Sequence, residues 1–423
     1  MADTKNIQVY AHWKGLPNPA LMGILSSERL RGKEIFSFSY TKEWLDSGYG
    51  QHLDPALQLY SGPQYPDVDK NNFGIFLDSS PDRWGRLLMR RREAAMARME
   101  NRSENNLFET DYLLGVFDGH RMGGLRFKDN PAGVFLNDNA AMASPPWTSL
   151  RELEYASLQL EKDNAIHDPD YLKWLNLLVA PGSSLGGARP KASVLDNKKR
   201  LWIAKFPSTN DDKDVGGWEM VVNELAIKAG LNVAEGIVKK FSKKRHTFLT
   251  KRFDRVENGE RIHFASAMTL LGLNDGNDYK DGISYLHLAE FLMRNGANVA
   301  LDLEELWRRI VFYIYVSNTD DHLRNHGFLL NNGGWILSPA FDINPIEYSL
   351  GLKLNISLTD NALVPEIALE VAKEFRVSSK RAKEIHNSIQ KTVSGWRKVA
   401  EKYEISKTEQ DRMSKAFKTD GKI

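Results

Sequence analysis

Hydrophobic and polar residues alternate with a period of two in short stretches near the start of the chain. The clearest stretches are residues 7–13 and 35–40, each bounded by glycine or polar turn residues. This alternation predicts strands with one buried face. Further on, Ser79-Ser80-Pro81-Asp82 is a plausible helix N-cap with proline in the first turn. It predicts a helix that runs to about Arg98. We therefore expect a small N-terminal domain of mixed strands and helix over residues 1–130.

The middle of the chain begins with a change of composition. Asn, Asp, Ala and Pro dominate residues 129–148, which predicts a linker. Beyond it we expect a strand-rich region over residues 148–258. Its expected elements are a helix at 149–160, a strand–loop–strand–strand unit at 178–206, a helix at 217–229 ended by Gly230, and strands at 233–241 and 246–253.

From about Phe264 onward the pattern becomes mainly helical. A strand-rich piece followed by a helix-rich piece predicts an α+β protein. This order matches the outline of a two-lobed protein-kinase-like core, with a strand-rich N-lobe over 148–258 and a helical C-lobe over 259–423. Many α+β proteins share this outline, so the function has to be argued from individual residues.

Composition and charge exclude several classes of protein. The chain has 423 residues, of which 42% are hydrophobic and 26% charged, and its net charge of +2 provides no strong attraction to nucleic acid. It has no cysteines, which excludes disulfides, zinc fingers and cysteine nucleophiles. The N-terminus lacks the apolar core of a signal peptide, and the apolar stretch Ile310 to Val316 is too short to span a bilayer. We expect a cytoplasmic protein with no membrane partner.

A run of small residues, Pro181 to Lys191 (PGSSLGGARPK), lies between two apolar segments. Small residues let backbone N–H groups approach phosphate oxygens, and Arg or Lys can neutralise the phosphate charge. The run matches neither the Walker A motif nor the usual Gly-rich loop of protein kinases. It is either a phosphate-binding loop or a flexible surface turn.

Lys205 is the single charge inside the apolar strand predicted by Leu201-Trp202-Ile203-Ala204-Lys205-Phe206. A kinase needs a lysine on a strand behind the Gly-rich loop to hold the nucleotide phosphates. Its acidic partner would come from the next helix, where Glu219 and Glu224 are available. The alternative is a lysine on the solvent face of a strand, which is the commoner arrangement.

The sharpest signal is Ser317-Asn318-Thr319-Asp320-Asp321-His322-Leu323-Arg324-Asn325, which follows an apolar helix. The protein-kinase catalytic loop places an Asp base five residues before a metal-binding Asn, and Asp320 and Asn325 have that spacing. Asp321 stands five residues before His326, a poor ligand for a hard cation, so Asp320 is the better candidate base. The alternative is a polar loop that caps a helix.

A second carboxylate follows in Ser338-Pro339-Ala340-Phe341-Asp342, beyond a predicted hairpin over 328–337. A kinase needs a carboxylate here to hold Mg²⁺ between the β- and γ-phosphates. The alternative is an Asp in a proline-flanked turn. Each signal alone is weak, but five parts of a kinase in the kinase order indicate an ATP-dependent phosphotransferase.

In these motifs the chain resembles the HipA serine/threonine kinase toxins of bacterial type II toxin–antitoxin systems. The resemblance covers nearly the whole chain and rests on S-S-x-G-G-A-R-P-K-A, N-T-D-x-H-x-x-N and F-D-x-x-P. It implies ATP and Mg²⁺ as cofactors, with Asp320 as the catalytic base and with Asn325 and Asp342 as the metal ligands. It also implies further nucleotide contacts: Gly186, Gly187, Ala188, Arg189, Lys191, Lys205, His322, and a hinge of Lys251, Arg252 and Phe253.

The resemblance also implies regulation and partners. A loop serine is autophosphorylated in the family, and Ser184 matches it, with Ser183 as second choice. The implied protein substrate is an aminoacyl-tRNA synthetase. The implied partner is a helix-turn-helix antitoxin of HipB type, through which alone the chain would contact DNA. The alternatives are a small-molecule or lipid kinase, and an inactive kinase-fold scaffold that binds a DNA-binding antitoxin.

Overall fold

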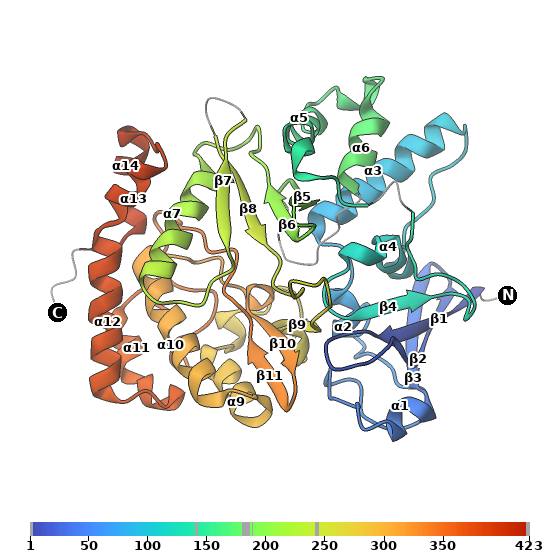
Figure 1. Ribbon diagram of the computed structural model, residues 1–423, viewed down its shortest axis with the longest axis horizontal. Coiled ribbons are helices and arrows are strands. Elements are labelled where there is room, and N and C mark those ends of the chain that lie inside the picture. Colours follow the sequence, from blue (N-terminus) through green and yellow to red (C-terminus); the bar gives the residue numbers. More distant parts are fainter. Residues whose placement is uncertain (1–2, 140–142, 180–186, 188, 242–244, 420–423) are drawn as a thin grey trace. The chain divides into compact units, whose positions relative to one another are not determined.

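The computed structural model describes residues 3–139, 143–179, 187, 189–241 and 245–419 (Figure 1). They belong to two compact units. Unit 1 comprises Met1–Thr209 and Asp254–Asn274, and unit 2 comprises Asn210–Phe253 and Asp275–Ile423. The predicted boundaries 1–130, 148–258 and 259–423 follow a different division and stay predictions.

Unit 1 begins with an antiparallel sheet of four strands in the order β3-β2-β1-β4 (Figure 1). Its strands are β1 (Asp3–Ala11), β2 (Ala20–Leu30), β3 (Lys33–Tyr40) and β4 (Leu125–Lys128). Arg31 and Gly32 join β2 to β3 with φ of 49° and 77°, as a tight hairpin turn requires. Ile7 pairs with Leu25 across the sheet, and both are buried. The predicted strands near 7–13 and 35–40 are confirmed.

The helices of unit 1 are α1 (Lys42–Asp46), α2 (Gly74–Asp78), α3 (Arg83–Met99), α4 (Glu109–Gly115), α5 (Leu150–Leu160), α6 (Tyr171–Val179) and α8 (Ala267–Leu270). Asp82 caps α3 by accepting the N–H of Gly85 at 2.8 Å, so the predicted helix start is confirmed. α6 packs against α3 and α5. The strand expected at Leu178 is wrong: Trp174, Leu175 and Leu178 have helical spacing and are buried in α6.

Unit 1 also holds the antiparallel hairpin of β5 (Lys191–Leu195) and β6 (Leu201–Lys205), and the short β9 (Phe264–Ser266). In unit 2, β7 (Gly236–Lys239) pairs antiparallel with β8 (Thr247–Lys251). β10 (Gly327–Asn331) and β11 (Gly334–Leu337) form the hairpin predicted over 328–337.

The helices of unit 2 are α7 (Val215–Lys228), α9 (Tyr285–Asn295), α10 (Val299–Val316), α11 (Pro365–Glu370), α12 (Ser379–Ser394), α13 (Trp396–Lys402) and α14 (Lys407–Met413). α10 is the core helix. Every residue from Arg309 to Val316 is buried, and α9, α11 and α12 pack around it (Figure 1). The apolar stretch at its end is therefore a core segment.

Antiparallel sheets and many helices confirm the predicted α+β class. Among the residues that the structure describes, no helix combines the length and the apolar character that a bilayer crossing requires.

Candidate functional site

The loop that carries Asp320 is fixed at its start by the end of α10. Ser317 adopts a left-handed conformation with φ of 49° and terminates the helix. The N–H of Asn318 bonds back to the carbonyl of Tyr313 at 3.0 Å, which satisfies one of the last carbonyls of the helix. The end of the buried helix α10 thus fixes the direction of the chain that leads to Asp320.

The two neighbouring aspartates of this loop have opposite surroundings. Asp320 is exposed, whereas Asp321 is completely buried. The Asp321 carboxylate accepts the backbone N–H of Lys353 at 2.9 Å and the hydroxyl of Tyr285. Asp321 therefore supports the loop from inside, and Asp320 is the carboxylate that an incoming hydroxyl could reach.

Burial dominates the electrostatics of Asp321. Loss of water and, to a smaller extent, the negative charge of Asp320 raise its pKa to about 6 against the opposing effect of the Lys353 and Tyr285 donors. Burial likewise lowers the pKa of His326 to about 3, so this imidazole is neutral. Its Nε2 lies 3.1 Å from the Asp321 carbonyl.

Asn325 presents an unused oxygen. Its side-chain amide nitrogen donates to the carbonyl of Asp320 at 2.7 Å, which defines the orientation of the amide group. The remaining oxygen, Oδ1, is buried and has no hydrogen-bond partner within the part of the chain that the structure describes. A buried amide oxygen with unused acceptor capacity is a suitable ligand for a hard cation such as Mg²⁺. His322 lies just before the turn Leu323–Asn325, and its carbonyl accepts the N–H of Asn325 at 2.8 Å.

A second loop, residues 338–345, is hydrogen-bonded to the first. Asp342 adopts a left-handed conformation with φ of 56°, and its Oδ1 accepts the side-chain amide of Asn344 at 3.0 Å. The backbone N–H of Asn344 then donates to Oδ1 of Asn318 at 3.0 Å. Unit 2 therefore brings the loop of Asp320 and Asn325 and the loop of Asp342 together.

The predicted hinge belongs to the same unit. Lys251 ends β8, and its ammonium lies 3.8 Å from the carboxylate of Glu235. Arg252 is buried. The ring of Phe253 lies 5.4 Å from that of Phe341, the residue before Asp342. A ring contact thus links the hinge to the loop of the second carboxylate.

Four of the other predicted contacts belong to unit 1. Lys191 and Lys205 face each other in register across the β5–β6 hairpin. Gly187 has φ of 98°, a conformation that favours glycine, and Arg189 follows two residues later. The predicted residues Ser183, Ser184, Gly186 and Ala188 lie outside the described residues.

Lys191 has a partner that sequence reasoning missed. Its ammonium lies 2.7 Å from the carboxylate of Asp82, and both side chains are almost fully buried. The indole N–H of Trp84 donates to the Lys191 carbonyl at 3.2 Å. The Ser79–Asp82 motif indicated only a helix cap, yet it also anchors the predicted nucleotide-binding lysine.

The two candidate partners of Lys205, Glu219 and Glu224, differ in the contacts that they make within α7 and unit 2. Glu224 pairs with Lys228 at 2.7 Å and with Lys402 at 2.6 Å, and it accepts the hydroxyl of Tyr403. It is therefore committed within unit 2. Glu219 is buried in the same helix, α7, and remains the candidate.

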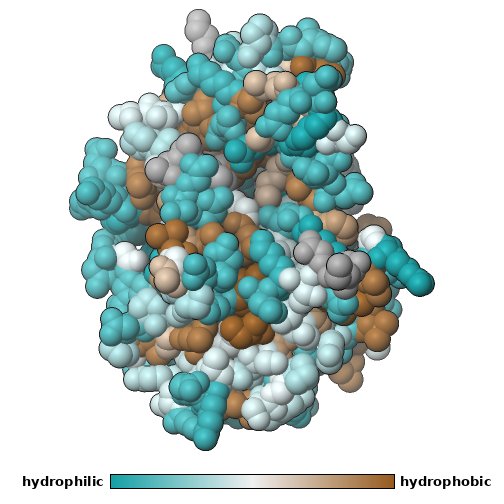
Figure 2. Space-filling model, turned by 90° about the vertical axis from the view of Figure 1, so that its right-hand side faces the viewer, coloured by the Kyte–Doolittle hydropathy of each residue, from teal (hydrophilic) through white to brown (hydrophobic). Residues whose placement is uncertain are grey.

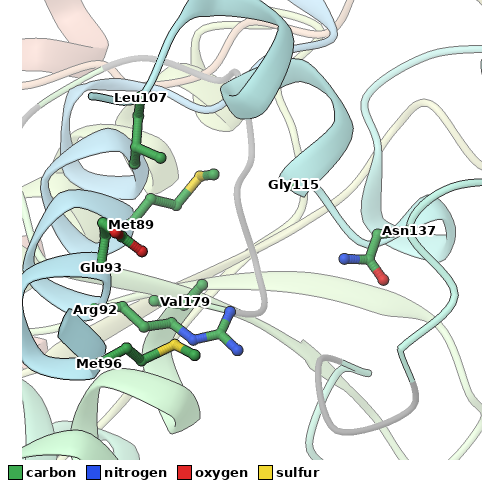
Figure 3. Close-up of a pocket in the computed structure, with 8 residues that line it drawn as sticks. All are labelled: Met89, Arg92, Glu93, Met96, Leu107, Gly115, Asn137 and Val179. Atoms are coloured by element: carbon green, nitrogen blue, oxygen red, sulfur yellow. The ribbon is translucent and has the colours of Figure 1, made fainter. Parts of the chain in front are cut away.

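A cavity of about 200 Å³ opens in unit 1. Its lining is mostly apolar, and the residues are Met89, Arg92, Glu93, Met96, Leu107, Gly115, Asn137 and Val179 (Figure 3). Figure 3 shows the side chains of α3 on one side and Asn137 on the other. Among the residues that the structure describes, none of the predicted site residues lines this cavity. Within the described ranges, no cluster of three or more His, Asp or Glu side chains is arranged to hold a metal.

One protein family and several known proteins are similar to this chain. Residues 183–396, just over half of the chain, match the HipA-like C-terminal domain family. The chain is 26% identical over 179 residues to "Putative kinase" of Haemophilus influenzae, and the match covers 38% of this chain and 52% of that protein. It is 28% identical over 147 residues to "Putative kinase Y4mE" of Sinorhizobium fredii, which covers 33% of each. The matches thus span about half and a third of these relatives.

The fold has a solved counterpart. The structure is similar to HipA of Shewanella oneidensis MR-1, solved with HipB and its operator DNA, with a TM-score of 0.66. The likeness covers 97% of this chain and 94% of that chain at 18% sequence identity, and at this identity it shows the fold alone. With just over half of its length matched by the family, the chain belongs to the HipA-like C-terminal domain family.

Proposed function

We propose that this protein is an ATP-dependent kinase that phosphorylates serine or threonine on a protein. The observation that carries the proposal is the hydrogen bond between Asn318 and Asn344, which holds the Asp342 loop against the loop of Asp320 and Asn325. A phosphoryl transfer site needs a base and two metal ligands in one place. Membership of the family and the HipA fold support the same function.

The residues of unit 2 fit the chemistry that the family implies. Mg²⁺, when bound with ATP, would neutralise the charge that develops on the phosphates. Asn325 and Asp342 would hold it, and the unpartnered Oδ1 of Asn325 is the observation that supports this fit. Asp320 would orient the substrate hydroxyl and accept its proton. Lys191, Lys205, Arg189, His322 and the small residues around Gly187 would face the phosphates, and the backbone of Lys251–Phe253 would contact adenine.

The test is a transfer assay with purified protein, Mg²⁺, γ-labelled ATP and bacterial lysate proteins. Asp320→Asn should reduce labelling by about a hundredfold or more, because the base is lost. Asp411→Asn is the matched control, an exposed aspartate whose side chain pairs with Arg397 at 2.9 Å. Equal labelling by wild type and Asp320→Asn would overturn the proposal and favour the inactive scaffold. Labelling confined to lipids or small molecules would favour that alternative enzyme class.

Regulation belongs to the same proposal. Ser184, with Ser183 as second choice, would be autophosphorylated, and a dianion on this loop would repel the phosphates of ATP. Mass spectrometry of the sample used for the assay should find phosphate on the peptide that contains both serines. Unmodified serines after long incubation with Mg²⁺ and ATP would contradict this part, and the loop state has to be known before a negative assay is interpreted.

Partners follow from the likeness to the Shewanella complex, in which HipA was solved with HipB and operator DNA. We propose a helix-turn-helix antitoxin of HipB type as partner and contact with DNA only through that complex. An aminoacyl-tRNA synthetase is the candidate substrate, so phosphorylation would arrest translation and growth.

A further inference from the structure

The segment after the Asp342 loop is attached to the loop of Asp320 on both sides of that aspartate. Three hydrogen bonds make the attachment: Ile346 N–H to the Ser317 carbonyl at 3.1 Å, the hydroxyls of Ser349 and Thr319 at 2.8 Å, and Lys353 N–H to Asp321 at 2.9 Å. Thr319 directly precedes Asp320. Residues 346–353 are therefore held beside the candidate base.

Along this segment, side chains that bond to the rest of unit 2 alternate with side chains that are exposed to solvent. Glu347 pairs with Lys213 at 2.5 Å and with Arg412 at 3.2 Å, and Ser349 bonds to Thr319. Between and after them, Tyr348 is 74% exposed and Leu350 is 90% exposed. Glu347 and Tyr348 lie in a turn. Two large side chains therefore face solvent on a segment that is attached through Glu347 and Ser349.

Tyr348 is also held in an unfavourable backbone conformation. Its φ is 62°, in the left-handed region that bulky residues rarely adopt. Such a residue persists only where its surroundings impose it, and these positions concentrate at functional sites. The attachments of Glu347 and Ser349 are the surroundings that impose it here.

Exposure alone would not mark a binding surface. Figure 2 shows hydrophobic groups scattered among hydrophilic ones on one face of the protein, and scattered exposed apolar residues are normal. The distinguishing feature of Tyr348 and Leu350 is their attachment to the candidate catalytic loop. The path from Cα of Asp320 through the Thr319–Ser349 bond to Cα of Leu350 is at most about 15 Å, which an extended substrate covers in about four residues.

We propose that Tyr348 and Leu350 form a docking surface for an apolar side chain of a protein substrate, close in sequence to the hydroxyl that is phosphorylated. The inference rests on the proposed kinase function and adds a substrate class to it. A hydroxyl that reaches Asp320 brings its neighbouring residues over this surface. An apolar neighbour would bury Tyr348 and Leu350, whereas a charged neighbour would lose water without gaining a partner.

The experiment is a peptide array with a fixed serine acceptor, in which each position within four residues of the serine carries each amino acid in turn. Transfer from γ-labelled ATP should be favoured severalfold by Leu, Ile, Met or Phe at one or more positions. Leu350→Ser and Tyr348→Ser should abolish that preference and lower kcat/KM for the best peptide about tenfold, mainly through KM. The KM for ATP should not change.

Leu301→Ser is the matched control. Leu301 is 74% exposed on α10, and its helix position is about 22 Å from the end that precedes the catalytic loop. It should keep the wild-type preference. Three outcomes would overturn the docking surface. The wild type could label all peptides equally whatever the neighbouring residue, or both variants could keep the preference for apolar neighbours. The third is that lysate proteins are labelled while no peptide is. Absence of Asp320-dependent labelling of any protein would instead overturn the proposed kinase function.

Discussion

Asn318 accepts a hydrogen bond from the backbone N–H of Asn344 through its side-chain oxygen, at 3.0 Å. Asn318 itself is buried at the end of α10, and Asn344 also donates to Asp342. A single amide group thus links the core helix, the candidate base loop and the candidate metal loop. Asn318 is adjacent in sequence to neither Asp320 nor Asp342. Its contribution to catalysis would therefore be to position these two carboxylates.

Asn318→Ala should therefore reduce kcat more than it changes KM. The N–H of Asn344 loses its partner, and a displacement of about 1 Å in a transfer site costs up to about a hundredfold in rate. Steady-state kinetics with labelled ATP measures both constants. We expect kcat to fall between about tenfold and a hundredfold.

The conservative variant separates positioning from general damage. Asn318→Asp keeps an oxygen acceptor for Asn344 and should retain most of the activity. Asn332→Ala changes an exposed asparagine of the β10–β11 turn and is the control for an Asn-to-Ala change. Equal losses of activity in all three variants would argue against a positioning role.

The unused oxygen of Asn325 makes a second prediction. Asn325→Ala should weaken the binding of Mg²⁺, because under the proposed function the buried Oδ1 would be one of the metal ligands. A non-hydrolysable ATP analogue with Mg²⁺ should raise the melting temperature of the wild type and raise it far less in the variant. With the analogue and EDTA the two proteins should behave alike. A full Mg²⁺-dependent shift in Asn325→Ala would exclude this residue as a ligand.

The sequence predicted the local features of this protein well. Asp320 was preferred to Asp321 on spacing, and the structure exposes the first and buries the second. The cap at Asp82 and the hairpin over 328–337 follow from turn and capping preferences that act over a few residues. The catalytic and binding roles of these residues stay predictions.

Features that depend on distant contacts left no local signal. Short strands were expected throughout the first 75 residues, but β2 was not located individually because its sequence, ALMGILSSERL, lacks a regular alternation. α6 was taken partly for a strand because a short apolar run fits either structure when buried. The Lys191–Asp82 pair joins a hairpin to a helix cap far away in the chain, so neither motif alone could indicate the other.

That buried pair makes a third prediction. Lys191→Met should lower the free energy of unfolding by about 3 kcal/mol or more, because Asp82 would keep a buried charge without its lysine. Asp82→Asn keeps a cap oxygen for Gly85 and should partly restore stability when combined with Lys191→Met. Urea unfolding of the two single variants and the double variant gives the coupling energy.

A surface pair is the control for this cycle. Arg294 and Glu290 pair at 2.5 Å on α9 with both side chains largely exposed. Arg294→Met should leave the free energy of unfolding nearly unchanged, since exposed ion pairs contribute little. A loss in Lys191→Met no larger than that in Arg294→Met would mean that the buried pair is not coupled to stability.

Asp321 makes the last prediction, on the pH dependence of stability. Burial raises its pKa to about 6, against about 3.9 for an unfolded aspartate. The folded protein therefore holds this proton more tightly than the unfolded chain. The group favours folding fully below about pH 4, and this contribution is lost as the pH rises through about 6. The difference of about two units corresponds to at most about 3 kcal/mol.

Asp321→Asn removes this ionisation, so wild type should lose stability relative to the variant between pH 4 and pH 7, by up to about 3 kcal/mol. Urea unfolding at closely spaced pH values measures the difference. Tyr285→Phe provides an internal comparison, because the Tyr285 hydroxyl donates to the ionised carboxylate and lowers its pKa. Without that donor the loss on raising the pH should be larger than in wild type. Parallel pH profiles of wild type and Asp321→Asn would show that the buried carboxylate does not titrate in this range.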